Sequence, residues 1–226
     1  MSRAWILAIA FVAAAGAGLS SQAPDSSFTS RFDVEKSDLA STGRNPYFIL
    51  EPGNTLTLED ASTRLVITVL NETKVVDGVE TRIVEERETE KGALIEVSRN
   101  YFAISRRTNS VFYFGEDVDM YKDGKIINHE GAWLSGAGGA RFGLMMPGLP
   151  LMRARYFQEV APKVAMDRAE IVSLTESIKT PAGAFTNVLK MEETTPLEPN
   201  AKEAKFYASG IGLIQDGDLK LVSVKK

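Results

Sequence analysis

The chain has 226 residues, with 26 Lys and Arg against 30 Asp and Glu, and its formal net charge is −4. This charge argues against a nucleic-acid-binding role, because binding to phosphates needs a clustered excess of basic residues. The sequence contains no Cys and one His, which excludes disulfides, thiolate catalysis and zinc sites built from several His or Cys ligands. A chain of this length can fold as one domain without such crosslinks.

The N-terminal segment has the layout of a secretory signal peptide. Arg3 precedes an apolar run to about Leu19, and Ser21 and Ala23 place small residues just before a cleavage site. The run is shorter than the ~20 residues needed to span a bilayer, which favours cleavage over a permanent anchor. We therefore expect residues 1–23 to be a signal peptide, and the mature chain to be periplasmic or extracellular with no stable membrane span.

The mature chain is expected to have two parts. Residues 24–45 are rich in Ser, Asp, Thr and Lys and poor in apolar residues, which is typical of a flexible linker. From Pro46 onwards, turn signals recur between short runs in which apolar and polar residues alternate. Residues 46–226 are therefore predicted to form a single β-rich domain.

Within this domain, Asp-Gly pairs mark the hairpins. Asp77-Gly78, Asp123-Gly124 and Asp216-Gly217 each separate two runs with strand character. Residues 131–150 are dense in Gly and Pro and predict a long surface loop. Residues 165–177 are compatible with strand or helix, and their alternation favours a strand. About a dozen short strands with little helix predict an all-β, mainly antiparallel fold, with a curved sheet forming a half-barrel or open barrel.

Several short motifs resemble known proteins. They are Asn45-Pro46-Tyr47-Phe48 with Pro52-Gly53, Tyr113 to Asp117, Pro181 to Phe185, Thr195 to Pro199, and Tyr207-Ala208 with Gly210 to Leu213. With them, most of the mature chain resembles a group of secreted bacterial β-rich proteins of unknown function. It is more distantly similar to TapB-like periplasmic curved-sheet proteins. The resemblance implies a curved antiparallel sheet outside the cytoplasm, and brings no catalytic residue with it.

An acidic segment suggests a cation site. In a twelve-residue calcium loop, Asp119, Asp123 and Glu130 would supply oxygen ligands around Gly124, but Tyr121 takes the place of a ligand. Both flanks also have strand character where that motif needs helices. A looser site would use carboxylates at the strand end, since calcium prefers oxygen ligands. The metal-binding candidates are Glu116, Asp117, Asp119, Asp123 and Glu130, with calcium as the cofactor considered and none required.

The same carboxylates could act as an acid and base pair. A glycoside hydrolase needs two such groups about 5–10 Å apart in a cleft, and Glu116 with Asp119 or Glu130 is the candidate pair. Tyr113, Tyr121 and Trp133 are the candidate ligand-binding aromatics, although aromatic residues on strands more often pack in the core.

Two further chemistries receive less support. His129 could form a catalytic triad with Ser135 and an acid, but nothing in the sequence orients these residues. Met145, Met146 and Met152 could bind Cu(I) through their thioethers, whereas Met is also an ordinary residue of hydrophobic cores.

Three functional hypotheses therefore remain. The favoured one is an exported, non-enzymatic binding or interaction module of the cell envelope, whose partner is a small or apolar ligand held in a curved sheet or an envelope protein. The alternatives are a carboxylate-dependent hydrolase of an envelope polymer and a calcium- or copper-binding periplasmic protein. An alternating inner face and a Gly-rich edge favour the binding module, because such sheets leave room for a ligand.

Overall fold

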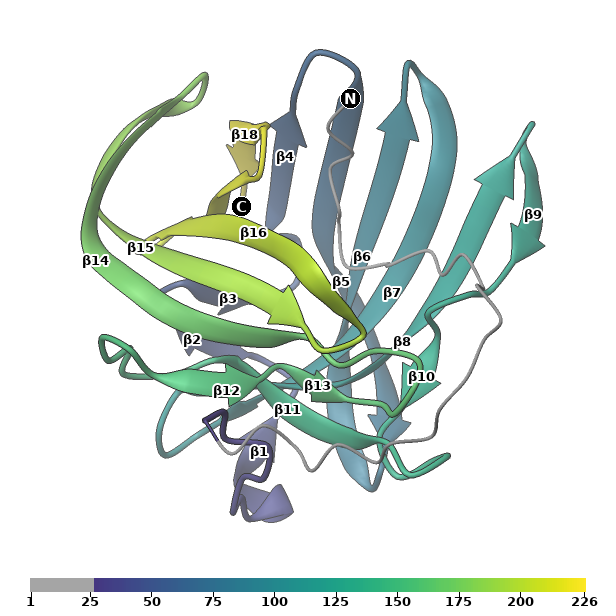
Figure 1. Cartoon of the computed structure of the whole chain (residues 1–226), viewed down its shortest axis with the longest axis vertical. Helices are drawn as coiled ribbons and strands as arrows, with labels where there is room; N and C mark the ends of the chain where they lie inside the picture. The colour runs from purple at the N-terminus through teal and green to yellow at the C-terminus, as the bar shows by residue number, and fades with distance from the viewer. Residues whose placement is uncertain (1–26) are drawn as a thin grey trace.

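The computed structural model describes residues 27–226, and these form an all-β fold of one 16-stranded sheet and a separate two-stranded sheet (Figure 1). This confirms the predicted fold class. The predicted signal peptide, residues 1–23, lies outside the described residues. The one helical segment from residue 27 onwards is the 3-10 turn η1 (Lys36–Asp38), and no helix in this part of the chain is long and apolar enough to cross a membrane.

The small sheet pairs β2 (Gly43–Asn45) with β3 (Phe48–Leu50). The strands of the large sheet are β1 (Leu39–Ala40), β4 (Thr55–Glu59), β5 (Thr63–Val76), β6 (Val79–Glu90), β7 (Ala93–Ser105), β8 (Val111–Lys122), β9 (Lys125–Asn128), β10 (Trp133–Leu134), β11 (Arg141–Met146), β12 (Arg155–Phe157), β13 (Glu159–Val160), β14 (Arg168–Thr180), β15 (Gly183–Thr195), β16 (Glu198–Ala208), β17 (Gly212–Asp216) and β18 (Leu219–Lys225).

The large sheet is antiparallel and almost closes on itself. Its main order is β12-β14-β15-β16-β17-β18-β4-β5-β6-β7-β8-β11-β13, so its first and last strands are separated in the chain by Gln158 alone. Strand β12 pairs with β14, whereas β13 pairs with β11 on the other side. One short segment therefore joins the two ends of the sheet, and the result is a barrel with a single unsealed seam (Figure 1).

The predicted hairpins are present because their turn residues accept left-handed backbone angles. Asp77 and Gly78 have φ of 50° and 75° between β5 and β6, and Asp123 and Gly124 have 52° and 74° between β8 and β9. Two positive φ values are characteristic of the type I′ turn, whose twist matches that of the flanking strands. Gly217 likewise has a φ of 53° between β17 and β18.

Large side chains fill much of the barrel interior. The main core cluster includes Phe102, Tyr113, Met146, Leu189 and Tyr207, each at most 2% exposed. A second cluster, around Leu58 and Leu219, continues the interior between β4, β17 and β18. A third cluster lies on the opposite, outer face of the sheet. It includes Tyr101 of β7 and Phe112 of β8, which are next in sequence to the interior residues Phe102 and Tyr113.

The segment expected to be a flexible linker covers this third cluster. Leu39 of β1 is 7% exposed and belongs to it, and Phe32 packs edge-on against Phe112 with ring centroids 6.0 Å apart. Phe28 packs against Phe157 of β12. The prediction of a flexible linker is therefore wrong from Phe28 onwards, because this segment packs on the sheet. It contains few apolar residues, but Phe28, Phe32 and Leu39 all contact the sheet.

The Gly-rich stretch also differs from its prediction. Strands β10 and β11 lie within residues 131–150, which were expected to form one long loop. Glycine is needed here for close approach, because a Cβ on Gly143 would lie 2.3 Å from the carbonyl carbon of Gln158. The stretch 165–177 was correctly predicted to favour a strand, since β14 begins at Arg168.

Replacing Gly143 should weaken the seam of the barrel. We expect Gly143→Ala to lower the free energy of unfolding by about 2 kcal/mol, because the new methyl group would overlap the backbone of Gln158. Chemical denaturation measures this change. Gly138→Ala is the control: a Cβ there meets open space, and its φ of 58° alone should cost about 1 kcal/mol. An equal or smaller loss for Gly143→Ala would contradict the close packing at the seam.

Candidate functional site

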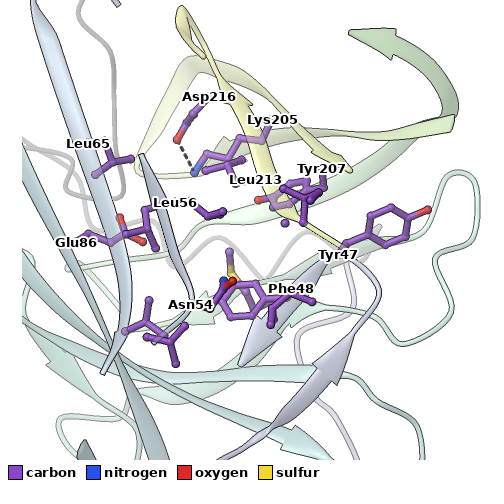
Figure 2. A pocket seen from close by; sticks show the side chains of 17 residues that line it. Tyr47, Phe48, Asn54, Leu56, Leu65, Glu86, Lys205, Tyr207, Leu213 and Asp216 are labelled. Carbon is purple, nitrogen blue, oxygen red and sulfur yellow. Dashed lines mark ion pairs between the residues drawn. The ribbon is translucent and has the colours of Figure 1, made fainter. Parts of the chain in front are cut away.

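An apolar pocket enters the barrel between the β2–β3 hairpin, strands β4 to β6 and strands β16 and β17 (Figure 2). Its volume is about 60 Å³. The lining residues are Tyr47, Phe48, Ile49, Asn54, Leu56, Leu65, Ile67, Val69, Val84, Glu86, Met145, Lys205, Tyr207, Ile211, Gly212, Leu213 and Asp216. Most of this wall is apolar, and charged side chains occur only at Glu86, Lys205 and Asp216.

Strand pairing brings the charged groups together. Lys205 of β16 lies opposite Asp216 of β17 in the sheet register, and Glu193 lies on the neighbouring strand β15. The Lys205 Nζ atom is 2.8 Å from Glu193 Oε2 and 3.6 Å from Asp216 Oδ2. All three residues are buried. We call Lys205, Glu193 and Asp216 the ion-pair cluster.

The carboxylates keep Lys205 charged inside the barrel. Burial alone would lower the pKa of Lys205, because it disfavours the charged form. Asp216 and Glu193 outweigh this effect and hold the pKa well above its usual value. The pKa of Asp216 is raised to about 6, mainly by burial and against the opposing effect of Lys205.

Glu86 lies on β6 across the pocket from this cluster. Burial raises its pKa to about 7, Lys205 acts against this shift, and the negative charges of Asp216 and Glu193 add to it. Within residues 27–226 its carboxylate has no salt-bridge partner, since the nearby ammonium of Lys205 pairs with Glu193 and Asp216. Glu86 is therefore a buried acid without a cation of its own.

Further acids line the interior beyond the pocket. Burial is the largest cause in each case, and it raises the pKa of Glu88 to about 7, of Glu96 and Glu203 to about 8, and of Asp167 to about 6. Glu116 and Glu159 are each 1% exposed, and each has one carboxylate oxygen without a hydrogen-bond partner. The described part of the barrel interior is therefore strongly acidic.

Gln158 connects the barrel seam to the ion-pair cluster. Its side-chain amide donates a hydrogen bond of 2.7 Å to Glu193 Oε1 and lies 3.7 Å from the sulfur of Met145. Gln158 is 1% exposed and separates β12 from β13. The seam and the charged end of the pocket therefore share one buried network.

The three aromatic candidates do not form a common surface. Tyr113 is fully buried, stacks on Phe102 and donates a hydrogen bond of 2.5 Å to Asn100 Oδ1. Trp133 packs edge-on against Tyr113, with ring centroids 5.3 Å apart. Tyr121 is half-buried near the end of β8, opposite Ile126 of β9. Tyr113 and Trp133 thus belong to the core, and Tyr121 lies apart from them.

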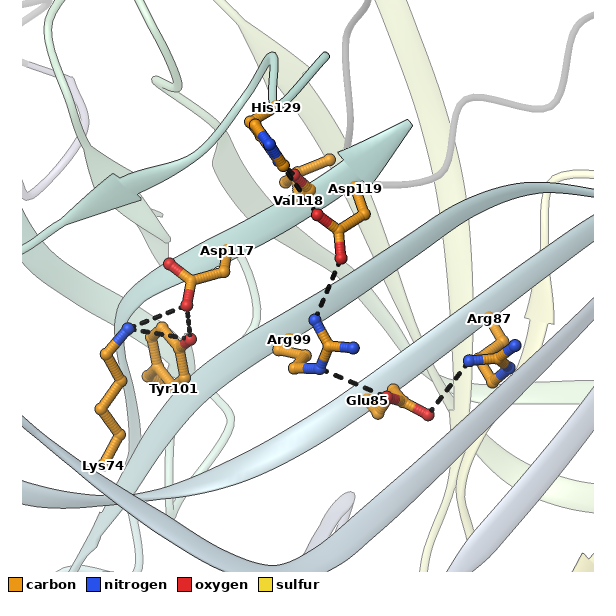
Figure 3. Close-up of polar contacts among 9 residues, drawn as sticks. All are labelled: Lys74, Glu85, Arg87, Arg99, Tyr101, Asp117, Val118, Asp119 and His129. Atoms are coloured by element: carbon orange, nitrogen blue, oxygen red, sulfur yellow. Dashed lines mark hydrogen bonds and ion pairs between the residues drawn. The ribbon is translucent and has the colours of Figure 1, made fainter. Parts of the chain in front are cut away.

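The predicted metal ligands are distributed over both faces of β8. Glu116 points into the barrel, whereas Asp117 binds Lys74 on the outer face at 2.9 Å and accepts a hydrogen bond from Tyr101 (Figure 3). Asp119 lies 3.2 Å from Arg99 on the same outer face. Asp123 and Glu130 are exposed. Among residues 27–226, no three His, Cys, Asp or Glu side chains are placed to hold a metal ion.

The remaining candidates are also separated. His129 Nδ1 lies 3.0 Å from Asp119 Oδ1, whereas the Ser135 hydroxyl donates to Asp77 Oδ2 at 3.0 Å (Figure 3 shows the His129 contact). Of the predicted copper ligands, Met145 and Met146 are buried and Met152 is 52% exposed. The structure therefore does not pair His129 with Ser135, and it does not gather the three methionines at one surface.

The charged residues at the end of the pocket, Glu86 and the ion-pair cluster, were not identified from the sequence. Strand parity was a usable signal: Met191 and Glu193 share one face of β15, and Lys205 and Tyr207 share one face of β16. A Lys two residues from a buried Tyr would then be expected to point inward. The partner of Lys205 could not be found in this way, because Asp216 becomes its neighbour only through the register of β16 and β17.

Comparisons of this chain with protein-family models, with curated proteins and with solved structures found no match. The resemblance to TapB-like proteins therefore stays a prediction.

Removing Lys205 should destabilise the fold. We expect Lys205→Met to lower the free energy of unfolding by about 3 kcal/mol at neutral pH, because it leaves buried carboxylates without their cation. The loss should be smaller at pH 5, because this lies below the pKa of about 6 of Asp216, and a protonated Asp216 no longer needs the cation. Chemical denaturation at both pH values measures it.

Lys202→Met is the matched control on the same strand. Lys202 forms a 2.6 Å pair with Glu192, but its side chain is 62% exposed. Exposed ion pairs contribute less than about 1 kcal/mol to the free energy of unfolding. Equal losses for the two variants would show that the ion-pair cluster has no special role in stability.

The raised pKa values of the interior acids predict that stability falls as pH rises. In the folded state Glu96 has a pKa of about 8, because of burial and then repulsion by Glu88 and Glu86, against 4.5 in the unfolded chain. The folded state therefore holds the proton of Glu96 more tightly than the unfolded chain does. The resulting contribution to the free energy of unfolding is fully present below about pH 4.5 and is lost as the pH rises to about 8. Chemical denaturation across this range should show the decrease.

Glu96→Gln removes the titrating group and should make this pH dependence shallower. At pH 8 the variant should be more stable than the parent by at least about 1 kcal/mol, the value of one pKa unit. Glu72→Gln, at an exposed position of β5, should leave the profile unchanged. A profile for Glu96→Gln that coincides with the parent would contradict a proton on Glu96 in the folded state.

Proposed function

We propose that the protein is an exported, non-enzymatic binding module that holds an apolar ligand in the pocket between the β2–β3 hairpin and strands β16 and β17. The observation that carries this proposal is the pocket itself, a mainly apolar space with a few polar groups at one end of an otherwise filled barrel. Pockets of this composition are the usual sites for small ligands.

The size of the pocket limits what it holds without rearrangement. At about 60 Å³ it has room for about four water molecules, whereas pockets for drug-sized ligands are about 300–1,000 Å³. The proposed ligand is therefore narrow, such as an alkyl chain or one end of a longer molecule. The partly exposed Tyr47, Ile211 and Leu213 form the mouth through which it would enter.

The wall formed by the β2–β3 hairpin is held in place by hydrogen bonds. Asn45 is fully buried, and its amide donates to the carbonyl oxygens of Asn109 at 2.8 Å and Pro147 at 2.9 Å. Its carbonyl oxygen accepts from the Tyr47 amide, and Gly210 N–H donates to Pro46 O at 2.7 Å. A wall fixed before binding reduces the entropy lost when a ligand binds.

The two alternatives receive less support from the described side chains. The hydrolase hypothesis needs Glu116 in one cleft with Asp119 or Glu130, but Asp119 lies on the opposite face of β8 and Glu130 is exposed, whereas Glu116 is buried. The metal hypothesis needs several ligands directed at one point, and the described residues offer no such group. A cell-envelope location remains part of the proposal, since it rests on the predicted signal peptide.

Titration with 1-hexanol tests the proposal. Amide chemical shifts in NMR spectra should change in a saturable way at residues lining the pocket. Leu213→Trp should abolish these changes, because the larger side chain fills the mouth, while Leu149→Trp at a 75% exposed position should not. If no saturable binding occurs, or if it survives Leu213→Trp, the pocket is not a ligand site.

A further inference from the structure

We propose that the ligand carries a cationic amine head group, and that it binds head first, with the amine between Glu86 and Asp216 at the deep end of the pocket. This inference rests on the proposed function and adds the chemical class of the ligand. An alkylamine or a longer amphiphile ending in a primary or secondary amine would fit this description.

The arrangement of the pocket supports this orientation. Glu86 and Asp216 are 8% and 2% exposed, whereas Tyr47 and Leu213 are only partly buried. Figure 2 shows Glu86 and Tyr47 on opposite sides of the pocket, with the Lys205 to Asp216 ion pair above the apolar side chains. A ligand entering past Tyr47 would therefore meet apolar walls first and carboxylates last.

The charges at the deep end favour a cation. Lys205 is the one cationic side chain that lines the pocket, and it is already paired with Glu193 and Asp216. Glu86 has no salt-bridge partner in the described part of the chain. An anionic head group would meet the carboxyl groups of Glu86 and Asp216 and a lysine whose charge is already compensated by its ion pairs, so the local charge disfavours it.

The unsatisfied hydrogen-bonding atoms point the same way. Two side-chain atoms lining the pocket are buried without a hydrogen-bond partner, Asn54 Oδ1 and Asp216 Oδ1, and both are acceptors. A ligand that satisfies them must donate hydrogen bonds. A primary ammonium has three donors and no acceptor, whereas a carboxylate has none to offer.

A metal ion would not match this site. Hard cations such as calcium need six to eight oxygen ligands, and residues 27–226 provide no group of three acids or histidines placed to hold a metal. A metal ion would also leave the apolar walls around Leu56 and Ile67 without an apolar group to contact. An amine on an alkyl chain fits both the carboxylates and the walls.

Binding should be coupled to the ionisation of Glu86. The charged and titratable groups that act on Glu86, or that respond to its charge, are Lys205 of β16, Asp216 of β17, Glu193 of β15, Glu88 of β6, Glu96 of β7, and Tyr113 and Glu116 of β8. With no cation bound, the pKa of Glu86 is about 7. An ammonium beside it favours the charged carboxylate, so amine binding releases a proton and strengthens from pH 6 to 8.

The test compares hexylamine, 1-hexanol and hexanoate as NMR-monitored probes of the protein at pH 7.5. Hexylamine should bind at least about tenfold more tightly than 1-hexanol, because it forms charge-assisted hydrogen bonds, and hexanoate should bind most weakly. Its affinity should also rise from pH 6 to 8, while that of 1-hexanol stays constant. Failure of all three probes to bind would reject the proposed function itself.

Variants identify the group that recognises the amine. Glu86→Gln should remove the preference for hexylamine and retain binding of 1-hexanol, whereas Glu72→Gln, an equal change of charge on the exposed side of β5, should retain both. If Glu86→Gln does not fold, the pH dependence of the parent protein decides. Equal binding of amine and alcohol, tighter binding of hexanoate, or an amine affinity independent of pH would overturn the inference while leaving an apolar pocket in place.

Discussion

The charge of Lys205 is the constraint on which much of the barrel interior depends. A buried ammonium requires nearby carboxylates, and Glu193 and Asp216 supply them from the strands on either side. The cluster therefore fixes the positions of β15, β16 and β17 relative to one another. Gln158 extends the same network to the seam, because its amide donates to Glu193 Oε1 while Lys205 pairs with Oε2. The pocket is formed where this charged network meets the apolar wall of β4 and β5.

The acidic interior indicates that stability was not the only requirement on these positions. Glu86, Glu96 and Glu116 lie on inward-facing positions of neighbouring strands, where apolar residues would avoid the cost of desolvation. Their raised pKa values follow from that burial and from their mutual repulsion. Retaining several such acids beside a single lysine is consistent with an interior that receives a positive group from outside.

Local signals made much of the fold predictable. The Asp77-Gly78 and Asp123-Gly124 turns identified hairpins, because two residues suffice to set the turn type. The inner face was harder to assign. Tyr113 and Glu116 are three residues apart and would face opposite sides of a regular strand, but β8 has an irregularity in this interval and both point inward. Gly115 permits it with a φ of 136°, and a Cβ there would lie 2.3 Å from Trp133 O.

The change of strand partner at Gln158 also determines which contacts would break if the barrel opened there. On one side of this residue three residue pairs join β12 to β14, and on the other side two pairs join β13 to β11. Opening the barrel at Gln158 would therefore break one of these short pairings and no hairpin, at the position where the Gln158 amide holds Glu193.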